Sequence, residues 1–280
     1  MVQGVLHSWG GSWVYFMGRI VCVANQKGGV GKTTTAVNLG AALALAGHPT
    51  LLVDIDPQAH ATSGCGVRSD QVVFSIYDAL LGGRVLEEVV QPSAAPGLSI
   101  VPATRDLVAA DLDLASMPRR EYRLRDLLSA VSHRYSYTVI DCPPSLGLMT
   151  INGLAAADSV LIPLQCEYYA LEGLAALIDT IGRIREHFNR NLEIEGILLT
   201  MFDGRNTLAH QVATEVRRHF GDQVFRTVIP RNVRLSECPS HGLPILMYDG
   251  RSRGAATYRE LASEVIEAEG STTVATPGGQ

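Results

Sequence analysis

The sequence predicts an α/β fold, a doubly wound and mostly parallel sheet flanked by helices. Three observations lead to this prediction. Short apolar runs rich in β-branched residues alternate with helical patterns, which favours strand–helix–strand units with right-handed crossovers. The runs are apolar throughout, as expected of strands buried on both faces of a parallel sheet. The first helical pattern ends at Gly47 followed by Pro49, a normal helix stop.

Seven strands are expected, with helices between most of them. The strands are predicted at 20–25, 50–55, 98–102, 137–141, 159–165, 194–202 and 224–229. The predicted helices include 33–46, 123–132, 171–188, 208–220 and 255–268. Ligands of doubly wound folds bind at the C-terminal ends of the strands, so motifs that directly follow a strand are the first candidates for a functional site.

The chain is long enough for one large core, and we predict a single domain over residues 18–268. Residues 1–17 hold no Lys or Arg and so lack the basic segment of a secretory signal. We expect them to be an unstructured leader. We also expect that translation naturally starts at Met17, so that the residues before it are not part of the native protein. The alternative is a short docked or disordered extension. The uncharged segment from 271 onward predicts a disordered tail, which we begin at residue 269.

Composition narrows the class of protein. With 46% apolar residues and a net charge of −5, the chain is an ordinary globular protein without a global nucleic-acid signal. The five cysteines are scattered and form no C-x-x-C pair, which argues for reduced, buried thiols and against a thiolate metal site. The reduced thiols lead us to expect a cytoplasmic protein, and no apolar run approaches the roughly 18–20 residues needed to cross a membrane.

A glycine-rich loop follows the first strand. Residues 26–33 read QKGGVGKT and fit the phosphate-binding pattern G-x-x-x-x-G-K-[ST], except that Gln26 replaces the first glycine. Lys32 is expected to reach the β- and γ-phosphates of a nucleotide, and the Thr33 hydroxyl to bind Mg²⁺. The alternative is a glycine-rich turn without a ligand. The expected nucleotide-binding residues of the loop are Lys27, Gly28, Gly29, Val30, Gly31, Lys32, Thr33 and Thr34.

The loop also contains both lysines of the chain, Lys27 and Lys32, whereas the other 21 basic residues are arginine. This distribution indicates a chemical requirement that a slim ammonium meets and a planar guanidinium does not.

Carboxylates follow two further strands. Asp54 and Asp56 end the second strand, where a period of two places them on the same side. They could orient a water and support a metal ion, or they could be turn-capping residues before Pro57. Asp141 ends the strand at 137–141 and is a candidate Mg²⁺ ligand, although an acid at a strand end is as often structural.

The run KGGVGKTT resembles the deviant Walker A motif of the ParA/MinD family of ATPases. This resemblance implies a P-loop NTPase fold with ATP and Mg²⁺ as cofactors. It also implies that Lys27 reaches across a nucleotide-sandwich homodimer to the partner's phosphate and that Asp56 positions the attacking water. Asp54 then supports the metal side, while Thr33 and Asp141 hold the ion.

Other segments distinguish among the subfamilies. The predicted C-terminal helix YRELASEVIEAEG is acidic, unlike the basic membrane helix of MinD-type proteins. The segments at 167–173, 198–212 and 224–245 resemble chromosomal ParA, also called Soj. In that family the P-R-N segment borders the adenine, which assigns Pro230 and Asn232 to the base. The alternative is a simple turn after the last strand.

A local basic balance suggests contact with DNA. Residues 183–259 hold 12 Arg against 8 acidic residues, a set suited to sequence-independent phosphate contact. Arg205 resembles a family DNA-binding arginine, and Arg234, Arg251 and Arg253 are further candidates. For any one of them the alternative is a solvated surface position.

The sequence thus predicts a ParA-type ATPase that partitions chromosomes or low-copy plasmids. The ATP-bound homodimer is expected to bind double-stranded DNA without sequence preference, in the nucleoid. A ParB-type centromere-binding protein and DNA are expected to stimulate its slow hydrolysis, with no membrane partner. Two alternatives stay open: a family ATPase that positions a protein cargo, and a superfamily ligase that uses ATP on a small metabolite.

Overall fold

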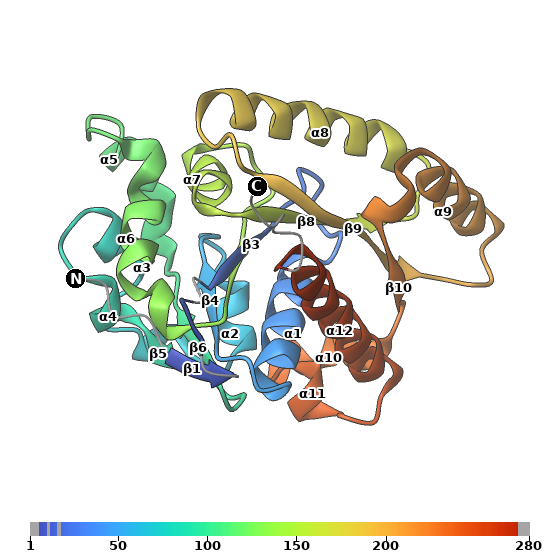
Figure 1. Ribbon diagram of the computed structural model, residues 1–280, viewed down its shortest axis with the longest axis horizontal. Helices are drawn as coiled ribbons and strands as arrows, with labels where there is room; N and C mark the ends of the chain where they lie inside the picture. The colour runs from blue at the N-terminus through green and yellow to red at the C-terminus, as the bar shows by residue number, and fades with distance from the viewer. Residues whose placement is uncertain (1–5, 10–11, 16–17, 274–280) are drawn as a thin grey trace.

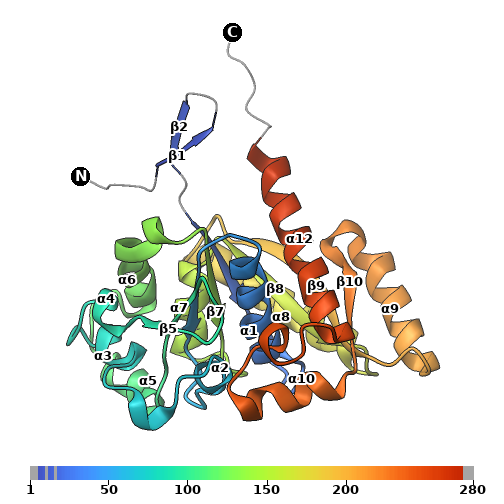
Figure 2. The same cartoon turned by 90° about the horizontal axis from the view of Figure 1, so that it is seen from below.

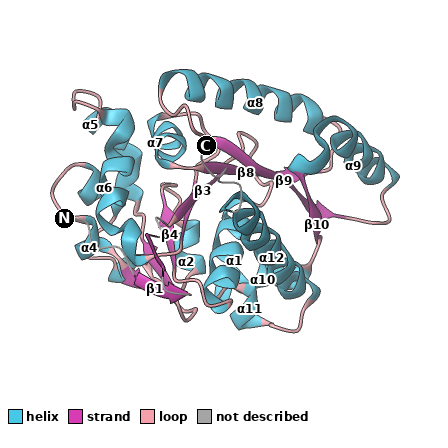
Figure 3. Ribbon diagram, viewed as in Figure 1, coloured by secondary structure: helices cyan, strands magenta, loops and turns pink. Residues whose placement is uncertain are grey.

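The fold is an eight-stranded sheet between two layers of helices, as predicted. A computed structural model describes residues 6–9, 12–15 and 18–273. The strand order is β10-β9-β8-β3-β7-β4-β6-β5, and all neighbouring strands are parallel except β5 and β6. Figure 1 shows the sheet between the helical layers, and Figure 3 shows the same arrangement by secondary structure.

All seven predicted strands are present, with ends that lie within two residues of the predicted ones. The strands of the sheet are β3 (Arg19–Val23), β4 (Thr50–Asp54), β5 (Gln91–Pro92), β6 (Leu98–Val101), β7 (Tyr137–Asp141), β8 (Ser159–Gln165), β9 (Glu193–Phe202) and β10 (Val224–Pro230).

The five predicted helices are present, together with shorter ones. The helices are α1 (Lys32–Leu45), α2 (His60–Gly64), α3 (Ile76–Leu80), α4 (Leu86–Val89), α5 (Ala110–Asp113), α6 (Arg123–Val131), α7 (Leu148–Ala156), α8 (Ala170–His187), α9 (Thr207–Phe220), α10 (Val233–Glu237), α11 (Ile245–Tyr248) and α12 (Arg253–Thr273). None of the described helices is both long and apolar enough to cross a membrane.

Two apolar cores lie on opposite faces of the sheet. Alternate residues of one strand supply them: Cys22 of β3 belongs to the core beneath α3 to α9, and Val21 to the core beneath α1 and α12. This alternation follows from the two-residue period of a strand. Because both faces are covered, the strands had to be apolar throughout.

The register brings the ends of the motif strands together. Val23 of β3 pairs with Asp141 of β7, and Asp141 pairs in turn with Asp54 of β4. The glycine-rich loop and both carboxylate motifs therefore leave the sheet from three adjacent strands at one edge. This is the edge where ligands of doubly wound folds bind.

The two ends of the chain differ from the prediction. Residues 1–17 were expected to be unstructured, but β1 (Leu6–Trp9) and β2 (Ser12–Tyr15) form an antiparallel pair (Figure 2). The Gly-Gly between them in the sequence is a hairpin signal that explains this pair. Helix α12 continues to Thr273, beyond the predicted start of the tail at 269, and residues 274–280 lie outside the described residues. The start of translation at Met17 stays a prediction.

Candidate functional site

The glycine-rich loop between β3 and α1 has the backbone of a phosphate cradle. Gly29 and Gly31 have φ angles of 74° and 87°, which glycine adopts without strain. A Cβ atom built on Gly28 or Gly29 would meet no atom of the described chain within 4 Å. Helix α1 begins at Lys32, so its first N–H groups and the positive end of its dipole are available to an anion.

Lys32 is buried inside this loop. The residue is only 7% exposed, and its Nζ donates to the Lys27 carbonyl oxygen at 3.0 Å. Burial lowers the pKa of Lys32, and the nearby charges of Asp141 and Asp56 oppose that shift. A poorly solvated ammonium therefore lies close to two carboxylates, where a phosphate would be a strong additional partner.

Lys27 lies at the surface instead. Its side chain is 46% exposed, and its Nζ pairs with Oε2 of Glu167 at 2.5 Å. Its backbone N–H donates to Oδ1 of Asn25 at 3.0 Å, and Nδ2 of Asn25 donates to the Pro163 carbonyl oxygen at 2.7 Å. The two lysines of the loop thus have separate surroundings, one inside and one outside.

Asp54 is fully buried and already has hydrogen-bond partners. Its Oδ2 accepts from the N–H and hydroxyl of Thr62 at 2.8 and 2.7 Å, and its Oδ1 accepts from the Asp56 N–H at 3.1 Å. Burial is the main cause that raises the pKa of Asp54 to about 6. Thr62 also accepts the Ala103 N–H at 2.9 Å. Asp54 therefore ties β4 to α2 and to the segment after β6, and its predicted support of the metal side stays a prediction.

Asp141 has the opposite character. It is fully buried, and neither carboxylate oxygen has a hydrogen-bond partner among the described residues. Burial and then the charge of Asp54 raise the pKa of Asp141 well above its usual value, whereas Thr33 and Lys32 act in the other direction. A buried carboxylate is costly unless it is paired, and the Thr33 hydroxyl and the Lys32 ammonium are the nearby groups that favour its charged form.

The donors at this point fit Mg²⁺. The Asp141 carboxylate and the Thr33 hydroxyl supply oxygen ligands, which Mg²⁺ prefers. Within the described chain, no three His, Cys, Asp or Glu side chains gather into a metal cluster. An ion here would take its remaining ligands from water and nucleotide phosphates, as is usual for Mg²⁺.

Asp56 follows β4 and is 8% exposed. Its Oδ1 accepts the Gln58 N–H at 2.9 Å, and its charge acts on Lys32. The structure thus brings Asp56, Asp141, Thr33 and Lys32 to one place, as the motifs predicted. The catalytic role of Asp56 stays a prediction.

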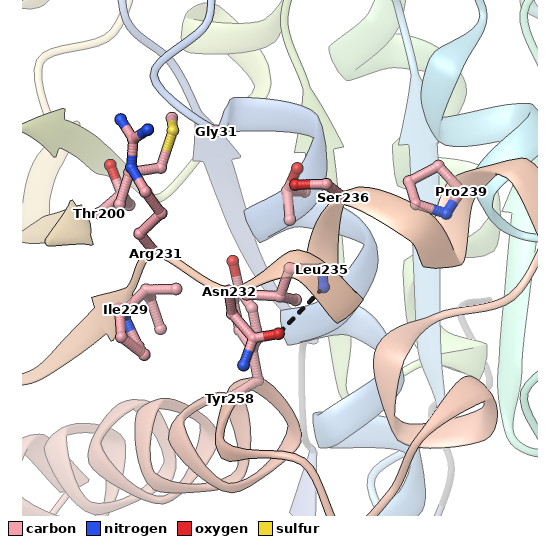
Figure 4. Close-up of a pocket in the computed structure, with 12 residues that line it drawn as sticks. Gly31, Thr200, Ile229, Arg231, Asn232, Leu235, Ser236, Pro239 and Tyr258 are labelled. Atoms are coloured by element: carbon pink, nitrogen blue, oxygen red, sulfur yellow. Dashed lines mark hydrogen bonds between the residues drawn. The ribbon is translucent and has the colours of Figure 1, made fainter. Parts of the chain in front are cut away.

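A cavity of about 390 Å³ opens beside the loop (Figure 4). Its lining includes Gly31 and Thr34 from the loop side, and Pro230 and Asn232, which were assigned to the base. Oδ1 of Asn232 caps α10 by accepting the N–H groups of Arg234 and Leu235 at 2.8 and 3.4 Å. The cavity therefore adjoins the glycine-rich loop, and the predicted contact of Pro230 and Asn232 with a base stays a prediction.

The candidate DNA-binding arginines lie on the surface. Arg205 follows β9, and its 90% exposed side chain pairs with Asp203 at 2.9 Å. Arg234 on α10 pairs with Glu237 at 2.9 Å and Asp249 at 3.6 Å. Arg251, two residues before α12, and Arg253, its first residue, are both exposed. Their contact with DNA stays a prediction.

Several residues of the site were missed by sequence reasoning. Glu167 directly follows β8, and Thr200 near the end of β9 donates its hydroxyl hydrogen to the Val30 carbonyl oxygen at 2.8 Å. Met201 and Arg231 line the cavity. All four lie near the C-terminal ends of predicted strands, so a search of every strand end would have found them.

Comparisons with known proteins agree with this geometry. A family model described as an AAA domain matches residues 18–194. A solved structure of cobyrinic acid a,c-diamide synthase from Mycobacterium smegmatis, with bound ADP and magnesium, has a TM-score of 0.81 and 35% identity, covering 91% of this chain and 97% of that one. The cell division ATPase MinD from Pyrococcus furiosus has a TM-score of 0.76 and 25% identity, covering 90% of this chain and 100% of its own.

The fold, the glycine-rich loop and the two strand-end acids define a P-loop ATPase with a deviant Walker A motif. Among such ATPases, this chain belongs to the ParA/Soj family of chromosome partitioning proteins. It is 56% identical to chromosome partitioning protein ParA of Myxococcus xanthus over 90% of this chain and 89% of that protein. It is 54% identical to sporulation initiation inhibitor protein Soj of Bacillus subtilis over 89% of this chain and 98% of that protein.

Proposed function

We propose that this chain is a DNA-partitioning switch driven by ATP. ATP closes a homodimer, the dimer binds double-stranded DNA of any sequence on the nucleoid, and hydrolysis releases it. Hydrolysis is weak in the isolated protein and is stimulated by a ParB-type centromere-binding protein together with DNA. The names of the ParA and Soj relatives support a role in partitioning chromosomes.

The observation that carries the proposal is the separation of the two lysines. Lys32 is buried among the carboxylates of its own chain, whereas Lys27 is half exposed and is held by the surface residue Glu167. An exposed ammonium that is not used inside its own site can exchange the Glu167 carboxylate for a phosphate on a second chain. Lys27 then makes ATP a condition for the dimer.

Within one protomer, Lys32 and the loop N–H groups bind the β- and γ-phosphates. Thr33 and Asp141 would hold Mg²⁺, which when bound neutralises phosphate charge. Asp56 orients the attacking water, and Asp54 fixes the backbone of Asp56 through the 3.1 Å hydrogen bond. Pro230 and Asn232 border the adenine in the 390 Å³ cavity. Catalysis of this kind acts by positioning and charge stabilisation.

DNA contact is assigned to Arg205 first, and to Arg234, Arg251 and Arg253 in support. Their exposure and their position after β9, on α10 and at the start of α12 support contact with a phosphate backbone. Binding through such groups is independent of sequence and weakens steeply with salt.

The test is an Asp56→Ala variant trapped with ATP. We expect it to bind nucleotide, to lose at least about 100-fold of its turnover, and to stay on DNA when ATP is present. A gel-shift assay at fixed salt, with and without ATP, measures the retention. If neither this variant nor the wild type binds DNA in an ATP-dependent way, the proposal is wrong.

One alternative is favoured by a specific observation, the likeness to a structure titled cobyrinic acid a,c-diamide synthase. A ligase that acts on a small metabolite would show ATP turnover that requires a small carboxylate or amine and does not respond to DNA. The higher identity to ParA and Soj, at 56% and 54%, favours partitioning. A family ATPase that positions a protein cargo is a further alternative, and it would show no retention on DNA.

A further inference from the structure

Asp203 holds Arg205 more completely than an ordinary surface ion pair would. Its Oδ1 accepts from the Arg205 N–H at 3.1 Å and from Nε at 2.9 Å, and its Oδ2 accepts from Nη2 at 2.9 Å. The guanidinium is thus bound through two of its nitrogens, in the geometry that arginine also uses for phosphate. Any phosphate that approaches Arg205 meets a guanidinium that is already in contact with a carboxylate.

The Asp203–Arg205 pair follows directly on the end of β9 that contacts the glycine-rich loop. Thr200 contacts the glycine-rich loop, and three residues further on Asp203 lines a second, polar cavity of about 280 Å³. That cavity shares Met201 and Arg231 with the cavity of the candidate base site. Figure 4 shows Arg231 and Thr200 at the same end of the latter. The Arg231 N–H also donates to the Phe202 carbonyl oxygen at 3.0 Å.

The charge of Asp203 persists under any condition in which DNA binding is measured. Its hydrogen bonds from Arg205, above all from the side chain, lower the pKa of Asp203 to about 2, and the charge of Arg231 acts in the same direction. The pair therefore carries no net charge near neutral pH. Arg205 is 90% exposed and stands where phosphate could reach it, but its attraction at a distance is cancelled by its neighbour.

We propose that Asp203 is a positioning residue that limits the strength of DNA binding through Arg205. A DNA phosphate competes with the Asp203 carboxylate for the same guanidinium nitrogens, so contact with DNA requires that this ion pair be loosened. The inference rests on the proposed function, because it takes Arg205 as a contact to DNA. It adds a residue that keeps binding weak enough to be reversible.

The test is the substitution Asp203→Asn in the full chain. An asparagine Oδ1 can still accept the Arg205 N–H, so the turn after β9 is retained, while the competing charge is removed. We expect DNA affinity in the presence of ATP to rise on the order of threefold per protomer, the effect in water of one like charge about 7 Å from a phosphate. The slope of log affinity against log salt should steepen by up to about 0.9 per protomer.

A matched control is Glu215→Gln on α9, which breaks the 2.7 Å ion pair with Arg218 and changes the net charge equally. We expect it to have a smaller effect than Asp203→Asn. Equal effects of the two variants would mean that only total charge matters and would overturn the inference. Arg205→Ala in both backgrounds completes the cycle, and the loss should be larger when Asp203 is already Asn.

The possible results distinguish a failure of this inference from a failure of the proposed function. If Arg205→Ala weakens DNA binding but Asp203→Asn leaves affinity and salt slope unchanged, the inference alone is wrong. If Arg205→Ala has no effect in either background, Arg205 does not contact DNA and the inference fails, whereas the proposed function fails only if no ATP-dependent DNA binding is found. A rise in affinity that disappears when Arg205 is removed supports the inference.

Discussion

Two regions differ in how their charged side chains are paired. The centre is the buried set of Lys32, Asp56 and Asp141 at the glycine-rich loop, and the surface is the exposed set that includes Arg205 and Arg234. In the centre, neither carboxylate oxygen of Asp141 has a hydrogen-bond partner among the described residues, and Nζ of Lys32 donates to the Lys27 carbonyl oxygen. On the surface, Arg205 and Arg234 are each paired with acidic side chains. The charged groups of the centre lie close together, are buried and make few hydrogen bonds, so a ligand there would add partners. The arginines of the surface are already paired with carboxylates, so a phosphate that binds there must compete with those carboxylates.

The largest effect is expected in the centre, from Asp141→Asn. Loss of this carboxylate should reduce Mg²⁺ affinity about 10–100-fold and reduce ATP turnover accordingly. Turnover as a function of Mg²⁺ concentration measures the result. Unchanged Mg²⁺ dependence would show that the ion does not use Asp141.

A second large effect is expected where the centre meets the surface, from Lys27→Gln. This variant should bind nucleotide within a few-fold of the wild type but should not dimerise with ATP or hydrolyse it. Lys27→Arg should fail in the same way, since a planar guanidinium does not replace a compact ammonium. Sedimentation with and without ATP measures the dimer. The control is Lys32→Gln, which should lose nucleotide binding itself, and an ATP-bound dimer of Lys27→Gln would contradict the assignment.

A moderate effect concerns the pH dependence of stability. The pKa of Asp54 is raised from 3.8 to about 6 in the folded chain, so the folded state binds more protons than the unfolded state between these values. The contribution of Asp54 to the free energy of unfolding is therefore present below about pH 4 and is lost as pH rises through 6, by roughly 3 kcal/mol.

Chemical denaturation of wild type and Asp54→Asn from pH 4 to pH 7, without nucleotide, isolates this contribution. The wild type should lose stability relative to the variant as pH rises, because asparagine does not titrate. Any constant penalty from the altered hydrogen bonds to Thr62 drops out of the slope. Parallel curves would mean that Asp54 titrates alike in both states.

The smallest effect is expected on the surface, from Arg234→Ala. Exposed ion pairs contribute little to stability, so the melting temperature should not change measurably despite the loss of contacts to Glu237 and Asp249. DNA retention should fall less than in Arg205→Ala. A clear drop in melting temperature would instead assign Arg234 a role in holding α10.

Much of the centre could be predicted from the sequence because its signals are local. The loop glycines, Lys32 and the acids at the ends of β4 and β7 lie in short motifs, and β7 and β8 have the predicted bounds at both ends. Short helices such as α2 and α10 were missed because five residues show no helical period.

The rest of the site depends on contacts between distant segments. Strand periodicity placed Asp54 and Asp56 on one side but could not reveal that Thr62 takes both hydrogen bonds to Oδ2 of Asp54. Glu167 meets Lys27 across 140 residues of sequence, and no local pattern contains such a pair. The acidic partners of the surface arginines could not be predicted either, because a surface ion pair depends on which side chains are within reach and not on a sequence motif.

The order of the strands also determines when the site can exist during synthesis. Strand β3 ends in the glycine-rich loop, yet its partners β7 and β8 begin only at Tyr137 and Ser159. Parallel pairing over such separations forms slowly. In a growing chain, β3 and the glycine-rich loop that follows it therefore lack the neighbouring strands β7 and β8 until both have been synthesised. The base cavity waits longer still, because Asn232 and Tyr258 complete it, so a nascent chain could hold phosphate before it could distinguish one nucleotide from another.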